Sequence, residues 1–429
     1  MSIRLCACGA GLLGALLAAG CGAPYLLRAA YEEARILLRR EPITAMLAQP
    51  ELAAPDREKL RLVLAARRYA RDAIGFDVGE SYATFARVDE EAVAYVVTAA
   101  YRDRLDPYVW GYPIVGRVPY RGFFGRGRAD AYAATLERRD LDTAVWPTTA
   151  FSTLGWFADP LLSSMLAEDP VDLVSVVFHE LAHTFLYVRS AAAFNESFAN
   201  FVGSRAAIAF FCDERAQEAE AVAAIDGSGP EPARMPAPRP RADHCPLAEA
   251  RWHDERVYAA VLEEAAAALT GLYAAPSTAG ARAEERRHIL AAASATLARR
   301  PLRTERYRGR DLTRANNAVL VQQLLYRRAL ERFDAVWRAT AGDLRRTVAR
   351  IAAAVKPAAD PFVGLAGIAQ PDERAAATRM PGPAPGEMQV PDTVPVRSQV
   401  PDPAPVALTT SASTLRQAAP TAASAPEKK

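Results

Sequence analysis

Residues 169–183 read DPVDLVSVVFHELAH, and this segment organises the rest of the chain. Asp169 is a favourable helix N-cap, Pro170 suits the first helical position, and the carboxylate of Asp172 complements the helix dipole. Apolar residues then recur at helical spacing as far as Phe185. The pattern predicts a buried amphipathic helix from about Pro170 to Val188.

Two of the five histidines, His179 and His183, lie four residues apart in this segment. Side chains at this spacing share one face of a helix, so both imidazoles can bind one metal ion. Glu180 lies one position round the helix, where a general base can deprotonate metal-bound water without binding the metal itself. The pattern predicts a zinc hydrolase. The alternative is an ordinary helix surface on which this motif occurs by chance.

A catalytic zinc ion usually has three protein ligands and one open position. We expect Glu196 to be the third ligand, because the helix can reverse near Arg189-Ser190 and return to the level of His183. The alternative role of Glu196 is to complement the dipole of a second helix. Three carboxylates in a charge-rich stretch compete with it as ligands: Asp213, Glu214 and Glu218.

The sequence HELAH followed by NE-x-x-A resembles the gluzincin metallopeptidases, in which a Glu on a second helix completes the zinc site. Over about residues 21–350 the chain also resembles a bacterial family of predicted aminopeptidases, which are lipoproteins of similar length. The resemblance implies one Zn²⁺ ion and a peptide substrate. Besides HELAH, the shared stretches are Pro119–Phe124, Phe151–Phe157, Asp159–Ser163, Ala193–Ala199, which contains the NE-x-x-A motif, and Asn316–Ala318.

The N-terminus has the features of an export signal. Arg4 precedes an uncharged, largely apolar run from Leu5 to Gly20. This run is shorter than the roughly 20 residues that a membrane-spanning helix usually needs. The run resembles a bacterial lipoprotein signal peptide, which implies that Cys21 is lipidated and becomes the first residue of the mature chain. A plain secretory signal or an uncleaved anchor is the alternative. Gly22 after the cysteine favours an outer-membrane lipoprotein that faces the periplasm.

Cysteine usage is compatible with export. Cys6 and Cys8 would leave with the signal peptide, which leaves Cys212 and Cys245 in the body of the protein. In an oxidising periplasm they could form one disulfide, and the alternative is two buried thiols.

We expect a zinc metallopeptidase domain at residues 21–356, between a signal peptide at 1–20 and a tail at 357–429. The tail is dominated by Pro, Ala, Ser and Thr, so it cannot bury enough apolar surface to order itself. It could act as a spacer or contact another component of the envelope. Proline-rich sequence at residues 226–246 is typical of a surface insertion.

The charge pattern argues against nucleic acid as a partner. The formal net charge is +2, and the 52 basic residues are interspersed with 50 acidic residues. We therefore expect membrane contact through the N-terminal lipid on Cys21.

Periodicity and breaking residues predict a mostly helical α+β fold, in which a small β-sheet precedes the HExxH helix and a C-terminal helical bundle backs it. The expected helices lie at residues 31–40, 57–72, 129–139 and over most of 250–356. The expected strands lie at residues 92–99, around 114–118 and at 142–146.

Substrate-binding residues are harder to predict. Tyr120-Arg121-Gly122 and Ser152–Gly155 could form a sheet edge along which a peptide lies, or could simply make turns at their glycines. Tyr326 is our candidate for the hydrogen-bond donor to the oxyanion, and a core tyrosine is the alternative. The sequence does not identify an acidic group for the substrate's α-amine.

We therefore expect a zinc-dependent peptidase of the bacterial envelope, with an aminopeptidase as the leading interpretation. A zinc endopeptidase, a cell-wall peptide amidase and a non-catalytic interaction lipoprotein are the alternatives. The expected metal ligands are His179, His183 and Glu196, and the expected catalytic residues are Glu180 and Tyr326.

Overall fold

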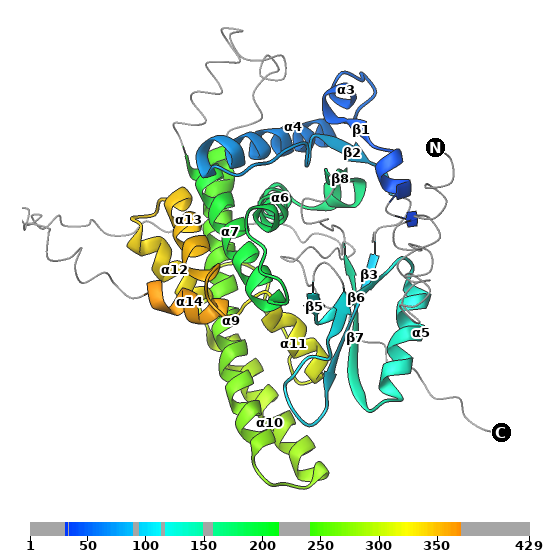
Figure 1. The fold of residues 1–429 in the computed structure, drawn as a ribbon, viewed down its shortest axis with the longest axis vertical. Helices are drawn as coiled ribbons and strands as arrows, with labels where there is room; N and C mark the ends of the chain where they lie inside the picture. Colours follow the sequence, from blue (N-terminus) through cyan, green and yellow to red (C-terminus); the bar gives the residue numbers. More distant parts are fainter. Residues whose placement is uncertain are drawn as a thin grey trace, which may run out of the picture.

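A computed structural model describes residues 31–32, 34–88, 94–112, 116–148, 158–213 and 241–369 of the 429-residue chain. The predicted signal peptide, Cys21 and residues 370–429 lie outside the described parts, as does most of the predicted insertion at 226–246. Within the described parts the fold is α+β and mostly helical, as predicted, with a small sheet beside a central group of helices (Figure 1).

Two antiparallel helices form the centre of the molecule. Helix α6 (Pro170–Phe185) begins as predicted, because the Asp169 side chain accepts hydrogen bonds from the backbone N–H groups of Val171 and Asp172. It ends three residues earlier than Val188, because Leu186 takes an extended conformation with φ −142°. Helix α7 (Ala192–Cys212) packs beside it, and both helices supply large apolar side chains to the main core.

The sheet beside these helices has three antiparallel strands. Strand β3 (Ala94–Tyr101) lies between β6 (Tyr120–Phe123) and β7 (Leu141–Thr148). Helix α5 (Arg126–Glu137), which contains most of the helix expected at residues 129–139, connects the two outer strands. Alternate residues of a strand face opposite sides of the sheet. Val97 and Ala99 face α5, whereas Ala100 packs against α11 (Asn317–Leu325), so helices cover both faces.

The strand expected around residues 114–118 is not part of the three-stranded sheet. Strand β5 (Gly116–Val118) pairs with β4 (Trp110–Tyr112) in a separate two-stranded sheet, and the next residues form β6 of the main sheet. Residues 113–115 lie outside the described parts. The sequence pattern did not reveal the antiparallel pairing of β4 with β5.

The N-terminal elements cover α6 from the other side. Helix α4 (Ala54–Tyr69) packs on α6 and continues as a short π-helix, η2 (Ala70–Ile74). A third small sheet joins distant segments. Its strands are β1 (Glu41–Pro42), β2 (Thr84–Ala86) and β8 (Leu161–Leu162), next to α3 (Ile43–Leu47) and the 3₁₀ turn η3 (Ser163–Ala167).

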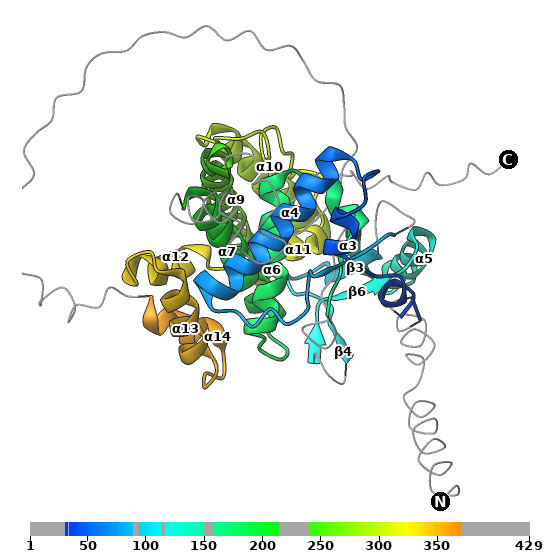
Figure 2. The same cartoon turned by 90° about the horizontal axis from the view of Figure 1, so that it is seen from above.

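The C-terminal part is helical, as predicted (Figure 2). The long helix α9 packs along α7 and α10, and α12 to α14 form a smaller group beside α7. By length and composition α9 could cross a membrane, but its inward residues pack in the core, as in a helix of a folded domain. The bounds are α9 (Cys245–Ala274), α10 (Ala279–Arg299), α12 (Leu330–Ala339) and α13 (Leu344–Val355).

Helix α14 (Pro361–Ile368) corrects the predicted start of the tail at residue 357. Asp360 caps its first turn by accepting a hydrogen bond from the N–H of Phe362, and Phe362 and Leu365 are buried in the main core. The folded body therefore extends at least to residue 369.

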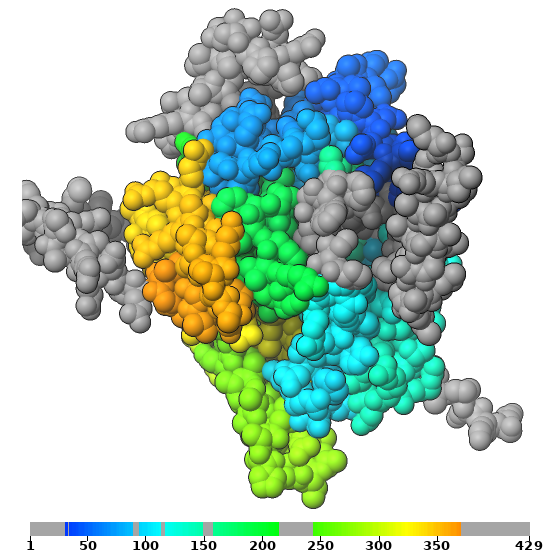
Figure 3. Space-filling model, viewed as in Figure 1, coloured from blue at the N-terminus to red at the C-terminus, as the bar shows by residue number. Residues whose placement is uncertain are grey.

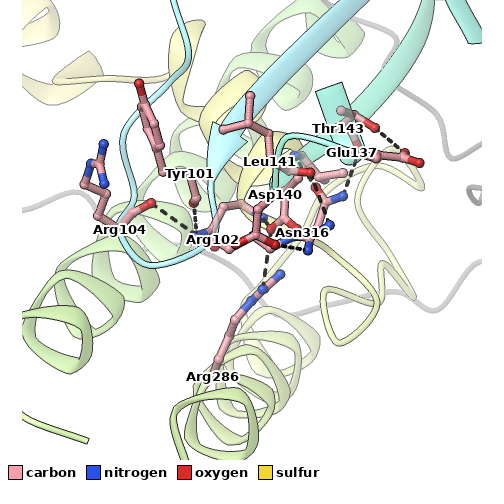
Figure 4. Close-up of polar contacts among 12 residues, drawn as sticks. Tyr101, Arg102, Arg104, Glu137, Asp140, Leu141, Thr143, Arg286 and Asn316 are labelled. Atoms are coloured by element: carbon pink, nitrogen blue, oxygen red, sulfur yellow. Dashed lines mark hydrogen bonds and ion pairs between the residues drawn. The ribbon is translucent and has the colours of Figure 1, made fainter. Parts of the chain in front are cut away.

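Asn316 joins the sheet to the helical part (Figure 4), and Asn317 does so as well. The Asn316 side chain caps α11 and also donates a hydrogen bond to the carbonyl oxygen of Thr143 at 2.8 Å. Asn317 is fully buried, and its amide donates to the carbonyl oxygens of Tyr101 at 2.8 Å and Arg104 at 3.2 Å. These residues therefore fix the position of α11 on the sheet.

Cys212 and Cys245 form a disulfide. It joins the end of α7 to the start of α9, across the proline-rich insertion, and the 3₁₀ turn η5 (Arg241–His244) leads into it. Their thiols are therefore not free to bind a second metal ion.

Candidate metal centre

The structure brings the three expected metal ligands together. His179 and His183 project from α6, and Glu196 projects from the second turn of α7. Glu196 Oε2 lies 3.3 Å from His179 Nε2 and 3.5 Å from His183 Nε2. All three side chains are at most 10% exposed. Among the described residues, three potential ligand atoms thus meet at one buried point.

The spacing of these atoms fits zinc. Bonds from Zn²⁺ to nitrogen and oxygen are about 2.0–2.2 Å long, so neighbouring ligand atoms of a tetrahedral site lie roughly 3.3–3.6 Å apart. The two measured contacts with Glu196 fall in this range. Two imidazoles and one carboxylate are also a donor set that catalytic zinc sites use.

The turn between α6 and α7 places Glu196 opposite the histidines. The side chain of Asn195 accepts a hydrogen bond from the N–H of Val188 and donates one to its carbonyl oxygen, each at 2.9 Å. Ser190 reverses the chain with a φ of +65°, near the predicted position, and its hydroxyl accepts a hydrogen bond from the N–H of Arg117. Asn195 thus helps to define the start of the helix that carries the third ligand.

The one competing carboxylate that the structure describes, Asp213, lies far from the point where the three candidate ligands meet. Asp213 follows the last residue of α7, 17 positions after Glu196, which corresponds to about 25 Å along a helix. Glu214 and Glu218 lie outside the described residues.

Close packing of the two helices supports the arrangement. Gly203 of α7 faces α6, where a Cβ atom would lie 2.6 Å from the carbonyl oxygen of Ser175 and 3.2 Å from Cβ of His179. Only glycine therefore permits this separation, and a larger residue would push against the turn of α6 that carries a ligand.

The carboxylate of Glu180 lies close to the ligands without being one of them. Burial raises its pKa, while the neighbouring His179 and His183 oppose this effect. Tyr82 and Asp159 also lie near it, and Glu180 contributes to the raised pKa of the buried Tyr82. The position suits a base that acts beside the metal rather than on it.

Three tyrosines lie near Glu196, and the sequence suggested a hydrogen-bond donor role only for Tyr326. The ring of Tyr326 lies 6.1 Å from that of His179, and the hydroxyl of Tyr120 donates a hydrogen bond to Glu196 Oε1 at 3.3 Å. Tyr187 also lies within electrostatic range of Glu196. Burial, reinforced by Glu196, raises the pKa of Tyr120 and of Tyr326 well above 10, so both are protonated donors at neutral pH.

Glu196 remains ionised in this setting. Burial alone would raise its pKa, but His183 and His179 hold it far below the usual range of a glutamate. The candidate third ligand is thus available as a carboxylate, the form that binds a cation.

Helix α7 also holds Tyr326 in place. Tyr326 directly follows the last residue of α11, and its carbonyl oxygen accepts a hydrogen bond from the Asn200 side chain at 2.8 Å. Ser197, next to Glu196, bonds to the carbonyl oxygen of Leu325 and to the N–H of Arg328. One helix therefore positions both the candidate third ligand and the candidate donor.

A buried ion pair lies next to the segment Leu325–Arg328 at the end of α11. Arg327 is fully buried and lies 2.9 Å from Glu255 of α9, and Glu255 in turn accepts a hydrogen bond from Asn200. The phenol of Tyr307 bonds to both Arg327 and Glu255.

The segment Tyr120-Arg121-Gly122, for which a sheet edge and a turn were both compatible with the sequence, lies at a sheet edge. It forms most of β6, which pairs with β3 on one side and has no other partner strand among the described residues. The second expected segment, Ser152–Gly155, lies outside the described residues. The unpaired side of β6 is therefore a sheet edge near Glu196, because Tyr120 of this strand contacts that carboxylate.

Comparison with known proteins identifies a family. No curated protein and no solved structure matches the chain. A family model with the description "Putative aminopeptidase" matches residues 24–359, which is most of the chain and includes every candidate ligand. The chain therefore belongs to this aminopeptidase family.

Proposed function

We propose that the protein is a zinc-dependent aminopeptidase in which His179, His183 and Glu196 bind the metal ion. The observation that carries this proposal is the convergence of two Nε2 atoms and one carboxylate oxygen at a buried point. The family description supports peptidase activity independently of that geometry.

Each of these residues has a separate role in the proposed mechanism. When bound, zinc would polarise the attacking water and the peptide carbonyl group. The Glu180 carboxylate accepts the proton of the water and passes it to the departing amine. The hydroxyl of Tyr326 donates a hydrogen bond to the carbonyl oxygen as negative charge develops there. Tyr120 holds Glu196 through its outer oxygen, and the free edge of β6 aligns the peptide main chain.

We also propose that the enzyme works in the bacterial envelope, anchored to the outer membrane through lipid on Cys21. The apolar segment before Cys21 supports export, and the Cys212–Cys245 disulfide is of the kind that persists in an oxidising compartment.

Replacing Glu180 with Gln tests the mechanism. Glu180→Gln keeps the size and polarity of the side chain but removes the base, so we expect bound zinc to be retained and kcat to fall by at least about 100-fold. Activity is measured on a panel of aminoacyl-arylamides and on internally quenched peptides. Glu284→Gln, on an exposed part of α10, is the matched control.

The same panel separates the candidate functions. Cleavage of the arylamides supports an aminopeptidase, whereas cleavage of the quenched peptides alone indicates an endopeptidase. Full activity in Glu180→Gln would remove this residue from the mechanism. A wild-type protein that holds zinc but cleaves neither substrate would be a non-catalytic lipoprotein.

A further inference from the structure

A large open groove lies beside the metal centre. Its volume is about 990 Å³, and α14, α9, the α6–α7 turn and the β4–β5 region border it. In Figure 3 it appears as the hollow where the orange, green, cyan and yellow-green surfaces meet. The proposed catalytic residues do not line it, so the chemistry described above leaves this groove without a role.

The groove adjoins the tyrosines that surround Glu196. Pro119, Val188 and Leu325 line the groove, and they are the immediate chain neighbours of Tyr120, Tyr187 and Tyr326 respectively. A ligand that fills the groove therefore approaches the metal centre from the side of these tyrosines. A volume near 990 Å³ is at the upper end of the usual range for ligand sites, about 300–1,000 Å³, and has room for several amino-acid residues.

The acidic side chains of the groove already have partners within the chain. Asp106 lies 3.3 Å from Arg104, Glu263 accepts a hydrogen bond from the N–H of Ala329, and Asp360 caps α14. Their carboxylates are thus engaged in holding the walls of the groove.

Two arginine side chains of the groove have no carboxylate partner among the described residues. Arg117 and Arg328 line the groove and are exposed, and neither pairs with a carboxylate among the described residues. The guanidinium of Arg328 lies 4.6 Å above the ring of Phe362, so α14 supports it in one orientation while its N–H groups remain available. The groove therefore offers unpaired positive charge to an anionic ligand.

We propose that this groove binds the C-terminal part of a short peptide substrate, with the free α-carboxylate at Arg328 and Arg117. This inference rests on the proposed aminopeptidase function. An aminopeptidase cleaves the bond next to the N-terminal residue, so the rest of the peptide must extend away from the metal. A guanidinium forms strong, charge-assisted hydrogen bonds with a carboxylate. The substrate class is thus short peptides with a free C-terminus, rather than long or C-terminally blocked chains.

The test compares a peptide acid with its amide. Binding of tetra-alanine and tetra-alanine amide to the full chain is measured by calorimetry at low ionic strength, because salt screens exposed charges. The Glu180→Gln background is used so that turnover does not consume the probe. We expect the acid to bind about 10-fold more tightly than the amide, and Arg328→Gln or Arg117→Gln to bring this ratio towards one. Arg332→Gln, exposed on the next turn and outside the groove, should keep the wild-type ratio.

Equal affinity for acid and amide, or an unchanged ratio in both groove variants, would overturn the proposal. Hydrolysis of peptides by the wild-type chain is measured separately. Acid-selective binding without hydrolysis would leave the groove assignment standing and remove the aminopeptidase. Hydrolysis without acid selectivity would support the peptidase activity and remove the assignment of the groove.

Discussion

At the scale of single residues, the proposed metal centre depends on contacts between residues far apart in the sequence. The HExxH spacing was enough to predict that His179 and His183 share a helix face, because that relation is local. The position of Glu196 followed from chain length and one reversal. The bond from Tyr120 to Glu196 crosses 76 positions, and no local pattern predicts such a pairing.

Gly203 is another such residue, and its role leads to a prediction. We expect Gly203→Ala to lower the free energy of unfolding by about 1–3 kcal/mol, because its Cβ would meet the backbone of α6 beside His179. It should also weaken zinc binding by displacing that histidine. Urea titration and a zinc competition assay measure the two effects.

The matched control is Gly271→Ala in α9, where a Cβ atom meets nothing within 4 Å. There the greater helix propensity of alanine should raise stability by up to about 1 kcal/mol. If both variants had the same stability, close packing of α6 on α7 would not limit position 203.

At the scale of elements, an N-cap aspartate followed by proline begins two helices, and it predicted only one of them. Asp169-Pro170 correctly marked the start of α6. Asp360-Pro361 has the same N-cap and first-turn proline and begins α14. The surrounding proline-rich composition hid the second signal, because composition averages over a helix of only 8 residues. Burial of Phe362 depends on tertiary contacts that a composition argument does not include.

The N-cap of α6 gives a pH-dependent prediction. Burial would raise the pKa of Asp169, but Arg251 and the helix N–H of Asp172 lower it to about 2. A carboxylate whose pKa is lower in the folded than in the unfolded state stabilises the fold above about pH 4 and loses that effect as the pH falls towards 2.

We therefore expect Asp169→Asn, which can still cap the helix, to be less stable than the wild type by about 1 kcal/mol or less at pH 7, because the carboxylate is 40% exposed. The difference should shrink as the pH is lowered from 4 towards 2. Urea titrations at several pH values measure it. A difference that stays constant over that range would show that the ion pair with Arg251 adds nothing.

At the scale of the whole molecule, the sequence predicted the fold class and the order of sheet, zinc helix and helical bundle, because each has its own periodicity. The separate β4–β5 pair and the docking of α11 by Asn316 and Asn317 depend on how distant segments meet. Together these contacts hold the sheet, the β4–β5 pair and α11 next to the helices that carry the candidate metal site.

The measurement that tests this account most directly is the zinc content of the purified protein by elemental analysis. We expect about one zinc ion per wild-type chain and much less in Glu196→Ala, which removes the oxygen that lies nearest both imidazoles. A wild-type chain without zinc after exposure to the metal, or a Glu196→Ala variant that retains the full amount, would contradict the proposed metal centre.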